Sequence, residues 1–241
     1  MATSGWARFR PRAGSREPAL GHRPFLPAAA ALLCCAALRA ETLRYSIHWP
    51  AGFHLGEGTL TSARRGETRS FALSLDASMP AFPIKDRFAA TATAALCSQS
   101  FVRTIVHGGR QTDESLEFDA VTGVITRQTR DGGRSSLPAA PCARDALTFL
   151  FHLREELRRN RLPRTETVYF GSPYSLRLEN RGLASVAAGG RAHQADLINV
   201  TATGPASDLD FELYFARDAA RTPVSVRVPF ALGVFTMELV P

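Results

Sequence analysis

The chain has 241 residues, of which 45% are hydrophobic and 21% charged, and its formal net charge is +7. Six of its basic residues fall in the first 40 positions, with Glu17 as the single acid there, so 23 basic and 21 acidic residues remain and the net charge is only +2. The remaining arginines alternate with Asp, Glu and Thr, which argues against nucleic acid as a partner, because such a surface needs clustered Lys and Arg. The six early arginines are Arg8, Arg10, Arg12, Arg16, Arg23 and Arg39.

The first 40 residues have the three parts of a secretory signal. An arginine-rich head ends at Arg23, an apolar run covers residues 25–38, and the small residue Ala40 marks the exit. The run is short for a membrane span, so the pattern predicts a signal peptide at residues 1–40 and one exported, periplasmic domain at residues 41–241. Membrane contact is then expected only through the signal peptide before cleavage. The alternative is that the apolar run remains as an N-terminal anchor.

Alternating apolar and polar residues predict strands in the first half of this domain. Leu43, Tyr45 and Ile47 fall on one side of such a segment, and residues 71–75 repeat the pattern, which is typical of half-buried strands. Gly108-Gly109 predicts a hairpin between residues 101–107 and 110–119. A further strand is expected at 124–130, and the Gly-, Ser- and Pro-rich segment 131–141 is predicted to be a loop.

Residues 142–160 break the alternation and predict one amphipathic helix. Apolar residues recur there at spacings of three and four, from Ala146 to Leu157. Asp145 in the first turn and Arg158 in the last match the helix dipole, and Pro163 ends the helix. We expect the apolar face to pack on the concave side of the sheet. Strands then resume at 167–170, 174–179, 192–203, 209–216, 223–229 and 234–240.

Two of the four cysteines, Cys97 and Cys142, belong to the predicted domain, while Cys34 and Cys35 lie in the leader. An even pair in an oxidising compartment predicts either a disulfide, which we favour, or two buried thiols. A disulfide closing a loop of about 45 residues would stabilise the fold by roughly 3 to 4 kcal/mol in the chain-entropy model. Neither cysteine is in a C-x-x-C pair, which argues against metal binding and thioredoxin-like chemistry.

Short motifs run in a fixed order along nearly the whole domain. They are Leu43-Arg44-Tyr45, Trp49, Gly56-Glu57-Gly58, Gly109-Arg110, Phe118-Asp119, Pro141-Cys142, Asp145-Ala146-Leu147, Asp218 to Arg221, Pro223-Val224, Gly233 and Glu238-Leu239. In this order they resemble an exported bacterial family catalogued as domain of unknown function 3108. Some members carry cysteines at both of the corresponding positions, which supports the pairing of Cys97 with Cys142. The helix opening departs from the family pattern, with Ala143-Arg144 between the Cys and the Asp.

The resemblance implies a mainly β protein. We expect an antiparallel curved sheet or half-barrel, like those of lipoprotein carriers, with one amphipathic helix packed on it. The family has no established activity, so it supplies no catalytic residues. A curved sheet with an apolar concave face could hold an acyl chain, and the phenylalanines of the domain, 15 less Phe9 and Phe25, could line it. The alternative is that they fill the core.

A search for catalytic motifs finds none. The chain lacks a G-x-S-x-G elbow, an H-E-x-x-H pair, a phosphate-binding loop and a calcium loop. Its histidines are scattered, and Glu155-Glu156 lies among arginines on the predicted helix, where surface ion pairs are expected. We therefore predict that the protein is not an enzyme and uses no cofactor or metal.

One turn has two interpretations. Asp218 and Arg221 flank the turn before Pro223, and a structural interpretation makes them a clamp that fixes the hairpin. The functional interpretation makes Arg221 the anchor of an anionic head group at the rim of the sheet.

Three functional hypotheses follow. The first is that the protein binds or carries a lipid or another apolar component of the cell envelope. The second is a structural or assembly role in the envelope without a ligand. The third, an enzyme acting on envelope polymers, would require Asp or Glu side chains that converge in a groove.

Overall fold

The computed structural model describes residues 39–49, 52–79, 82–205, 208–230 and 233–241. Within these residues the protein is one curved, mainly antiparallel sheet of 15 strands with a single helix, α1 (Ala146–Arg158). This confirms the predicted fold class. The predicted signal peptide lies outside the described residues except for its last two positions, which belong to the first strand.

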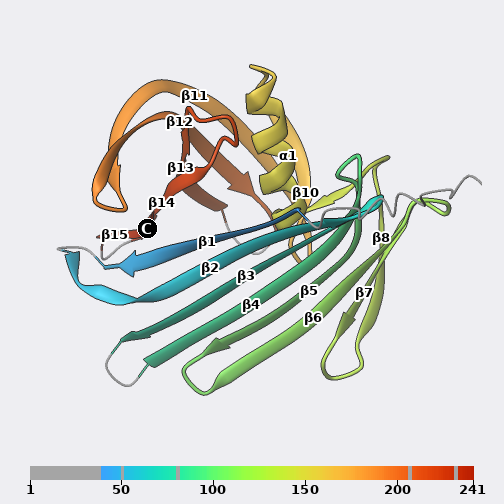
Figure 1. Ribbon diagram of the computed structural model, residues 1–241. Coiled ribbons are helices and arrows are strands. Elements are labelled where there is room, and N and C mark those ends of the chain that lie inside the picture. Colours follow the sequence, from blue (N-terminus) through green and yellow to red (C-terminus); the bar gives the residue numbers. More distant parts are fainter. Residues whose placement is uncertain (1–38, 50–51, 80–81, 206–207, 231–232) are drawn as a thin grey trace, which may run out of the picture. The chain divides into compact units, whose positions relative to one another are not determined.

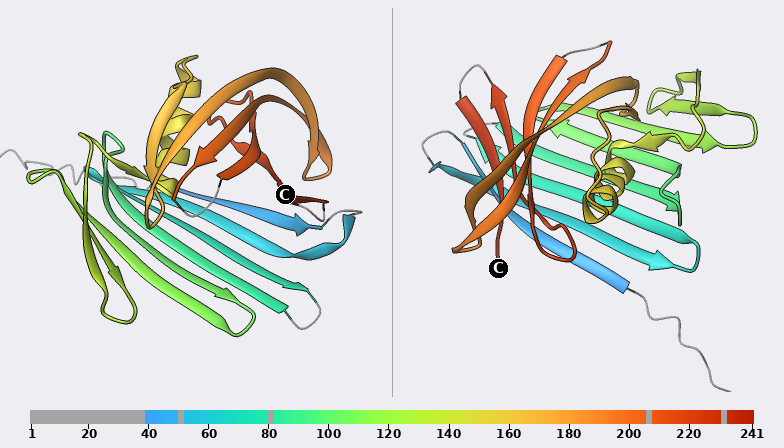
Figure 2. Two further views of the ribbon diagram at one scale, coloured as in Figure 1. Left: turned by 180° about the vertical axis from the view of Figure 1, so that it is seen from behind. Right: turned by 90° about the horizontal axis from the view of Figure 1, so that it is seen from above.

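The strands follow one another across the sheet nearly in chain order (Figures 1 and 2). The exception is β1, which pairs with β2 on one side and with the last strand, β15, on the other. The short β9 pairs parallel with β10 at one edge, and β8 forms the other edge. The bounds are β1 Arg39–His48, β2 His54–Arg65, β3 Thr68–Met79, β4 Phe82–Thr93, β5 Ser98–His107, β6 Arg110–Asp119, β7 Val124–Thr129, β8 Arg134–Pro138, β9 Arg144–Asp145, β10 Thr165–Tyr169, β11 Pro173–Ala188, β12 Arg191–Thr203, β13 Asp208–Ala216, β14 Pro223–Phe230 and β15 Gly233–Leu239.

Alternation along the strands gives the sheet two different faces. Tyr45 and Ile47 are buried on one face of β1, as the pattern predicted. The register places Leu60 opposite Leu43, and Leu73 opposite Leu60, so the same face continues across β2 and β3. We call this the inner face, because it is the one on which α1 packs.

The sequence pattern places the start of α1 too early. Residues 142–145 form a turn and the strand β9, because Arg144 and Asp145 pair with β10. Asp145 then caps the helix: its carboxylate accepts hydrogen bonds from the backbone N–H groups of Leu147 (2.8 Å) and Thr148 (3.0 Å). It also accepts from the hydroxyls of Ser98 and Thr148 at 2.5 and 2.6 Å, so this fully buried carboxylate ties the helix to β5.

The two sides of α1 pack on two different parts of the sheet. Leu147 and Phe151 join the core of the N-terminal strands, where Phe151 stacks on Phe71 with ring centroids 4.1 Å apart. Leu153 and Leu157 join a second core formed by β10 to β13. The helix therefore fills the space between the two parts of the sheet.

A buried arginine of α1 joins both parts by polar contacts. The guanidinium of Arg154 donates two hydrogen bonds to Glu41 of β1, at 2.8 and 2.9 Å, and one to the carbonyl of Ala220 at 3.2 Å. Tyr45 of β1 donates a hydrogen bond to the carbonyl of Pro223 at 2.8 Å. Through these contacts, Glu41 and Tyr45 of β1 are linked to the turn before β14 and to the first residue of that strand.

A disulfide joins Cys97 to Cys142, as predicted, with the two Cα atoms 4.5 Å apart. It ties the turn between β4 and β5 to the segment that precedes α1. Two hydrogen bonds support the same junction, from Ser98 N to Ala143 O (2.9 Å) and from Arg144 Nε to Leu96 O (3.0 Å).

Other element boundaries differ from those predicted. The segment 131–141 is not wholly a loop, since residues 134–138 form β8 by pairing with β7. No strand was predicted over residues 82–93, where β4 pairs on both sides. The strand predicted at 174–179 is longer in the structure and continues to Ala188 in β11. Its second half also pairs with β12, beyond an irregularity in register at Asn180.

Removal of the α1 cap should destabilise the fold strongly. We expect Asp145→Ala to lower the free energy of unfolding by about 2 to 4 kcal/mol, because it removes the cap and the partners of two buried hydroxyls. The exposed Asp119 also accepts from two backbone N–H groups, at 2.8 and 3.1 Å, so Asp119→Ala is the matched control, with a loss below about 1 kcal/mol. Urea unfolding would measure both, and equal losses would contradict the proposed importance of the cap.

The helix should also make stability depend on pH. Burial, reinforced by the guanidinium of Arg144, lowers the pKa of His152 to about 4 from its ordinary value of 6.5. Because the folded state disfavours the proton, this contribution to stability is present above pH 6.5 and is lost as the pH falls toward 4. Acidic groups add their own dependence, so the test compares wild type with His152→Gln in urea at several pH values. The variant should show a flatter dependence in this window; identical slopes would contradict the assignment to His152.

Candidate functional site

The helix covers only part of the inner face. Its Phe151 stacks on Phe71 of β3, and its Glu155 forms an ion pair of 3.4 Å with Arg69 of the same strand. At a rise of about 3.3 Å per strand residue, Leu75 and Ala77 of the same strand lie roughly 13 and 20 Å beyond Phe71. The inner face near the β1–β2 and β5–β6 turns is thus outside the reach of α1, and Figure 1 shows these turns and the helix toward opposite ends of the N-terminal strands.

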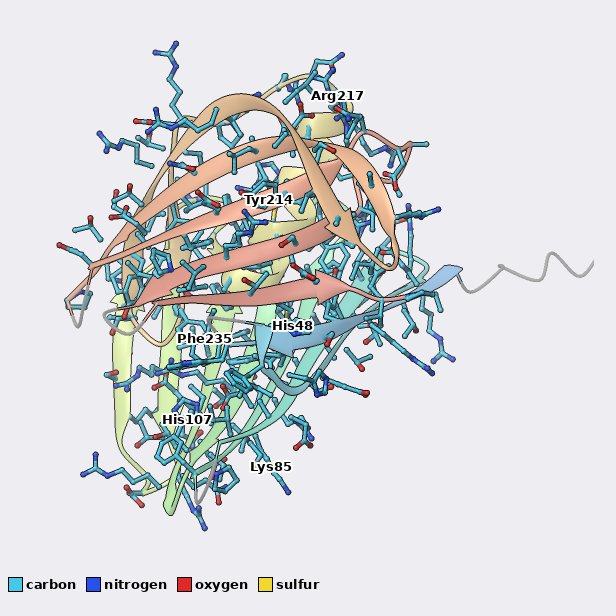
Figure 3. The ribbon with its side chains drawn as sticks, turned by 90° about the vertical axis from the view of Figure 1, so that its left-hand side faces the viewer. His48, Lys85, His107, Tyr214, Arg217 and Phe235 are labelled. Atoms are coloured by element: carbon cyan, nitrogen blue, oxygen red, sulfur yellow. A yellow bond between two sulfur atoms is a disulfide. The ribbon has the colours of Figure 1, made fainter. Side chains whose placement is uncertain are left out.

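This uncovered end of the inner face is apolar. Its half-buried side chains, which we call the mouth surface, are Leu75, Ile84, Ile105, Val228, Phe235 and Met237. The register joins them across the sheet, because Ala77 lies opposite Ile84, Ile47 opposite Met237, and Val228 opposite Phe235. In Figure 3 the labelled Phe235 lies above His107, which ends β5 at the same end of the sheet.

Gly58 allows the mouth surface to form around β2. A Cβ atom at this position would lie 3.1 Å from Leu75 Cδ2, 3.3 Å from Met237 Sδ and 3.6 Å from Tyr45 Cβ. The contacts show that these side chains share one face and meet over the glycine. A larger residue at position 58 would separate Leu75 from Met237.

A polar pair lies within this apolar region. Asp86 of β4 is 8% exposed and lies directly opposite both Leu75 and Ile105. Its carboxylate is 3.1 Å from Nε2 of His107. No group of three potential metal ligands occurs among the described residues.

A cluster of charged side chains borders the mouth surface on β5 to β7. Glu114 is buried, and its Oε2 accepts hydrogen bonds from Arg103 (3.2 Å) and Arg127 (2.7 Å). The hydrogen bond that Arg127 donates to Glu114 raises the pKa of Arg127 above its ordinary value. One carboxylate between two guanidinium groups leaves this cluster with an excess of one positive charge.

The turn between β10 and β11 packs on Arg103 and Glu114 of the cluster and leaves Arg127 partly exposed. Arg103 lies over the ring of Phe170, 4.5 Å from its centroid, and that ring also contacts Phe88 and Phe101. A Cβ atom on Gly171 would overlap Glu114 Oε1 and lie 2.6 Å from Arg103 Nη2. Another residue here would displace these two charged groups and strain the backbone, since the φ of +80° is unfavourable for residues other than glycine.

Sequence reasoning missed this cluster, although the chain contains a signal for it. Arg103 is two residues from each of the inward-facing Phe101 and Ile105, so it lies on the same face of its strand. Glu114 likewise shares a face with Leu116 and Phe118. Charged residues at inward positions of amphipathic strands are unusual, because burial of an unpaired charge is costly. Recognising the partners would have required the β5–β6 register, in which Arg103 lies opposite Glu114.

The Arg221 N–H donates to the Asp218 carbonyl at 3.2 Å, but the two side chains do not form the predicted clamp. Asp218 instead accepts hydrogen bonds from the N–H and hydroxyl of Thr222, at 3.0 and 2.6 Å. Arg221, with a φ of 51°, reaches the buried Asp196 at 2.6 Å, and Arg217 binds the same carboxylate at 2.8 Å. This turn lies at the other end of β14 from Val228, so the structure does not bring Arg221 to the mouth surface.

The two neighbouring acids of the predicted helix, Glu155 and Glu156, lie on α1 and form the expected ion pairs. Glu155 pairs with Arg69 and Arg158, and Glu156 pairs with Arg159 and Arg161. They form ion pairs rather than a pair of acid–base carboxylates. No helix among the described residues has the length and apolar character of a membrane span.

Comparison with known proteins identifies one family. The model of the family described as "Protein of unknown function (DUF3108)" matches residues 44–240. No curated protein and no solved structure matches the chain.

The charge cluster gives a stability prediction. We expect Glu114→Gln to lower the free energy of unfolding by about 2 to 4 kcal/mol, because Arg103 and Arg127 would face each other without a counter-charge. The control is Glu179→Gln on β11, whose carboxylate is exposed and pairs with two arginines; we expect a change within about 1 kcal/mol. Chemical unfolding measures both, and a Glu114→Gln protein as stable as the control would refute the interpretation.

Proposed function

This chain belongs to the DUF3108 family, whose description gives no activity, and from its own geometry we propose that the protein binds a lipid with an acidic head group. The observation that carries the proposal is the mouth surface. Its apolar side chains lie on the same face of the sheet as α1 but outside the area covered by α1. Burial of such a surface by an acyl chain is favourable, at about 25 cal/mol per Å² of apolar area removed from water.

The position of the filled core limits where the ligand can bind. Phe71, Phe101, Phe149 and Phe151 are buried between α1 and the sheet, so they support the alternative that the phenylalanines fill the core. The acyl chain is therefore proposed to lie on the mouth surface beyond the helix and not in its place.

The charge cluster favours an acidic head group. Arg103 and Arg127 share one carboxylate, and Arg127 is the more exposed of the two guanidinium groups, at 34%. Arginine suits phosphate and carboxylate groups because its donors match their geometry. Arg103 shares β5 with Ile105, which places the head-group site beside the acyl-chain site.

We also propose that the protein is exported to the periplasm and acts there without catalysis. The leader pattern supports export, and the disulfide is of a kind that persists in oxidising compartments. The anchoring role predicted for Arg221 is not part of this proposal, because its turn lies at the other end of β14 from the mouth surface.

Binding can be measured with cis-parinaric acid, a fluorescent fatty acid. Wild-type protein should enhance its fluorescence, and Ile105→Asp should weaken binding about tenfold or more, because a carboxylate would have to be desolvated against the chain. Val102→Asp is the matched control: it lies on the same strand, but on the outer face and 45% exposed. It should bind as wild type does.

Two results would contradict the proposal. One is the absence of both parinaric acid binding and copurifying lipid in mass spectra of natively purified protein. The other is an equal loss of binding in the Ile105→Asp and Val102→Asp proteins when thermal melting shows both to be folded.

The structural or assembly role remains the second candidate. Phe53 and Phe82 are exposed at 69% and 41% near turns at the mouth end of the sheet, where a partner protein could cover them. A ligand-free protein that elutes as an oligomer, and as a monomer after Phe53→Ser, would favour this role over lipid binding.

A further inference from the structure

A second concave surface lies on the other face of the sheet. Strands β11 to β15 curl away from α1 and enclose a groove of about 740 Å³. The tip of the β11–β12 hairpin reaches the end of the chain, since a Cβ atom on Gly189 would lie 3.4 Å from the carbonyl oxygen of Leu239. Figure 1 shows these two strands arching over β13 and β14.

Alternation along β13 separates the groove from the helix. Leu213 and Phe215 belong to the core that packs on α1. Glu212 and Tyr214 point to the other face, where the Tyr214 hydroxyl donates to Glu212 at 2.6 Å and accepts from Arg227 at 3.0 Å. The groove is therefore distinct from the mouth surface.

The charges of the groove balance. Its walls carry three arginines, Arg177, Arg181 and Arg227, and three acids, Glu179, Asp210 and Glu212. Glu179 lies 3.8 Å from Arg177 and 3.1 Å from Arg181. A groove with no net charge and both donors and acceptors gives no preference to a polyanion such as nucleic acid.

A polar row crosses the floor of the groove. The register aligns Glu179 with Asn199, Asn199 with Glu212, Glu212 with Arg227 and Arg227 with Thr236. Asn199 is at the middle of the strands, and its Oδ1 is buried without a hydrogen-bond partner. Asn199 also lines the groove, and its amide NH₂ group can donate a hydrogen bond to a ligand hydroxyl.

A small apolar surface lies beside this row. Pro229 and Val234 face each other across β14 and β15, and Val234 is 43% exposed. They add a surface on which the C–H groups of a ring can pack. The polar row and this apolar pair together suit a ligand that carries many hydroxyls on a carbon ring.

We infer that the groove of β11 to β15 binds a hydroxyl-rich, uncharged saccharide. Each hydroxyl both donates and accepts hydrogen bonds, which matches the alternation of carboxylates, guanidinium groups and amide along the row. An acyl chain would have to desolvate these charges, and an extended peptide would find a sheet face here instead of an open strand edge.

The test uses two oligosaccharides, maltohexaose and chitohexaose, with full-length domain labelled for NMR. At least one should shift backbone resonances of β11 to β15 and leave those of the mouth surface unchanged. Asn199→Leu should weaken its affinity about tenfold, because the amide donor that lines the groove is lost. Gln128→Leu, the same kind of change on the exposed face of β7, is the control and should leave the affinity unchanged.

The inference is overturned if neither oligosaccharide shifts the β11 to β15 resonances, or if folded Asn199→Leu binds as tightly as wild type. Should Asn199→Leu melt early, Glu212→Gln takes its place and should also weaken binding, whereas unchanged affinity would overturn the inference. Binding of cis-parinaric acid is measured on the same samples. Because the two surfaces are on opposite faces, either one can fail its test without the other.

Discussion

The fold depends on one helix that must bury the apolar faces of two parts of one sheet. Leu147 and Phe151 are packed against the N-terminal strands, while Leu153 and Leu157 are packed against β10 to β13. A helix with a single narrow apolar stripe could serve only one of them. Arg154 adds a polar link to Glu41 that no apolar contact replaces, because the buried guanidinium needs that carboxylate.

Local patterns were enough to predict strands with one helix and most of these elements, whereas the curved sheet was expected from the family resemblance. Alternation over residues 43–49 and the period of α1 each reflect a single face that must be buried, so a short window contains the information. The start of α1 and the strand β8 were not predictable in this way. The start of α1 depends on the pairing of β9 with β10, and β8 on pairing with its neighbour β7; propensity gives way to such contacts.

The candidate sites were less predictable than the fold. An apolar concave face was expected, but the phenylalanines proposed to line it mostly fill the core, and the mouth surface is largely aliphatic. Its members lie on β3, β4, β5, β14 and β15, so only the register brings them together. Arg221 shows the same limit, since its partner Asp196 lies on a different strand and could not be paired with it from spacing alone.

The place of β1 between β2 and β15 affects the order in which the chain can fold. Tyr45 and Leu239 are opposite each other although they come from the two ends of the domain. During synthesis, β1 to β8 can pair as a meander of local hairpins, but one side of β1 stays an open edge until the last strand arrives. Open edges are sites of wrong pairing, so this protein is most prone to aggregation in the interval before its final residues emerge.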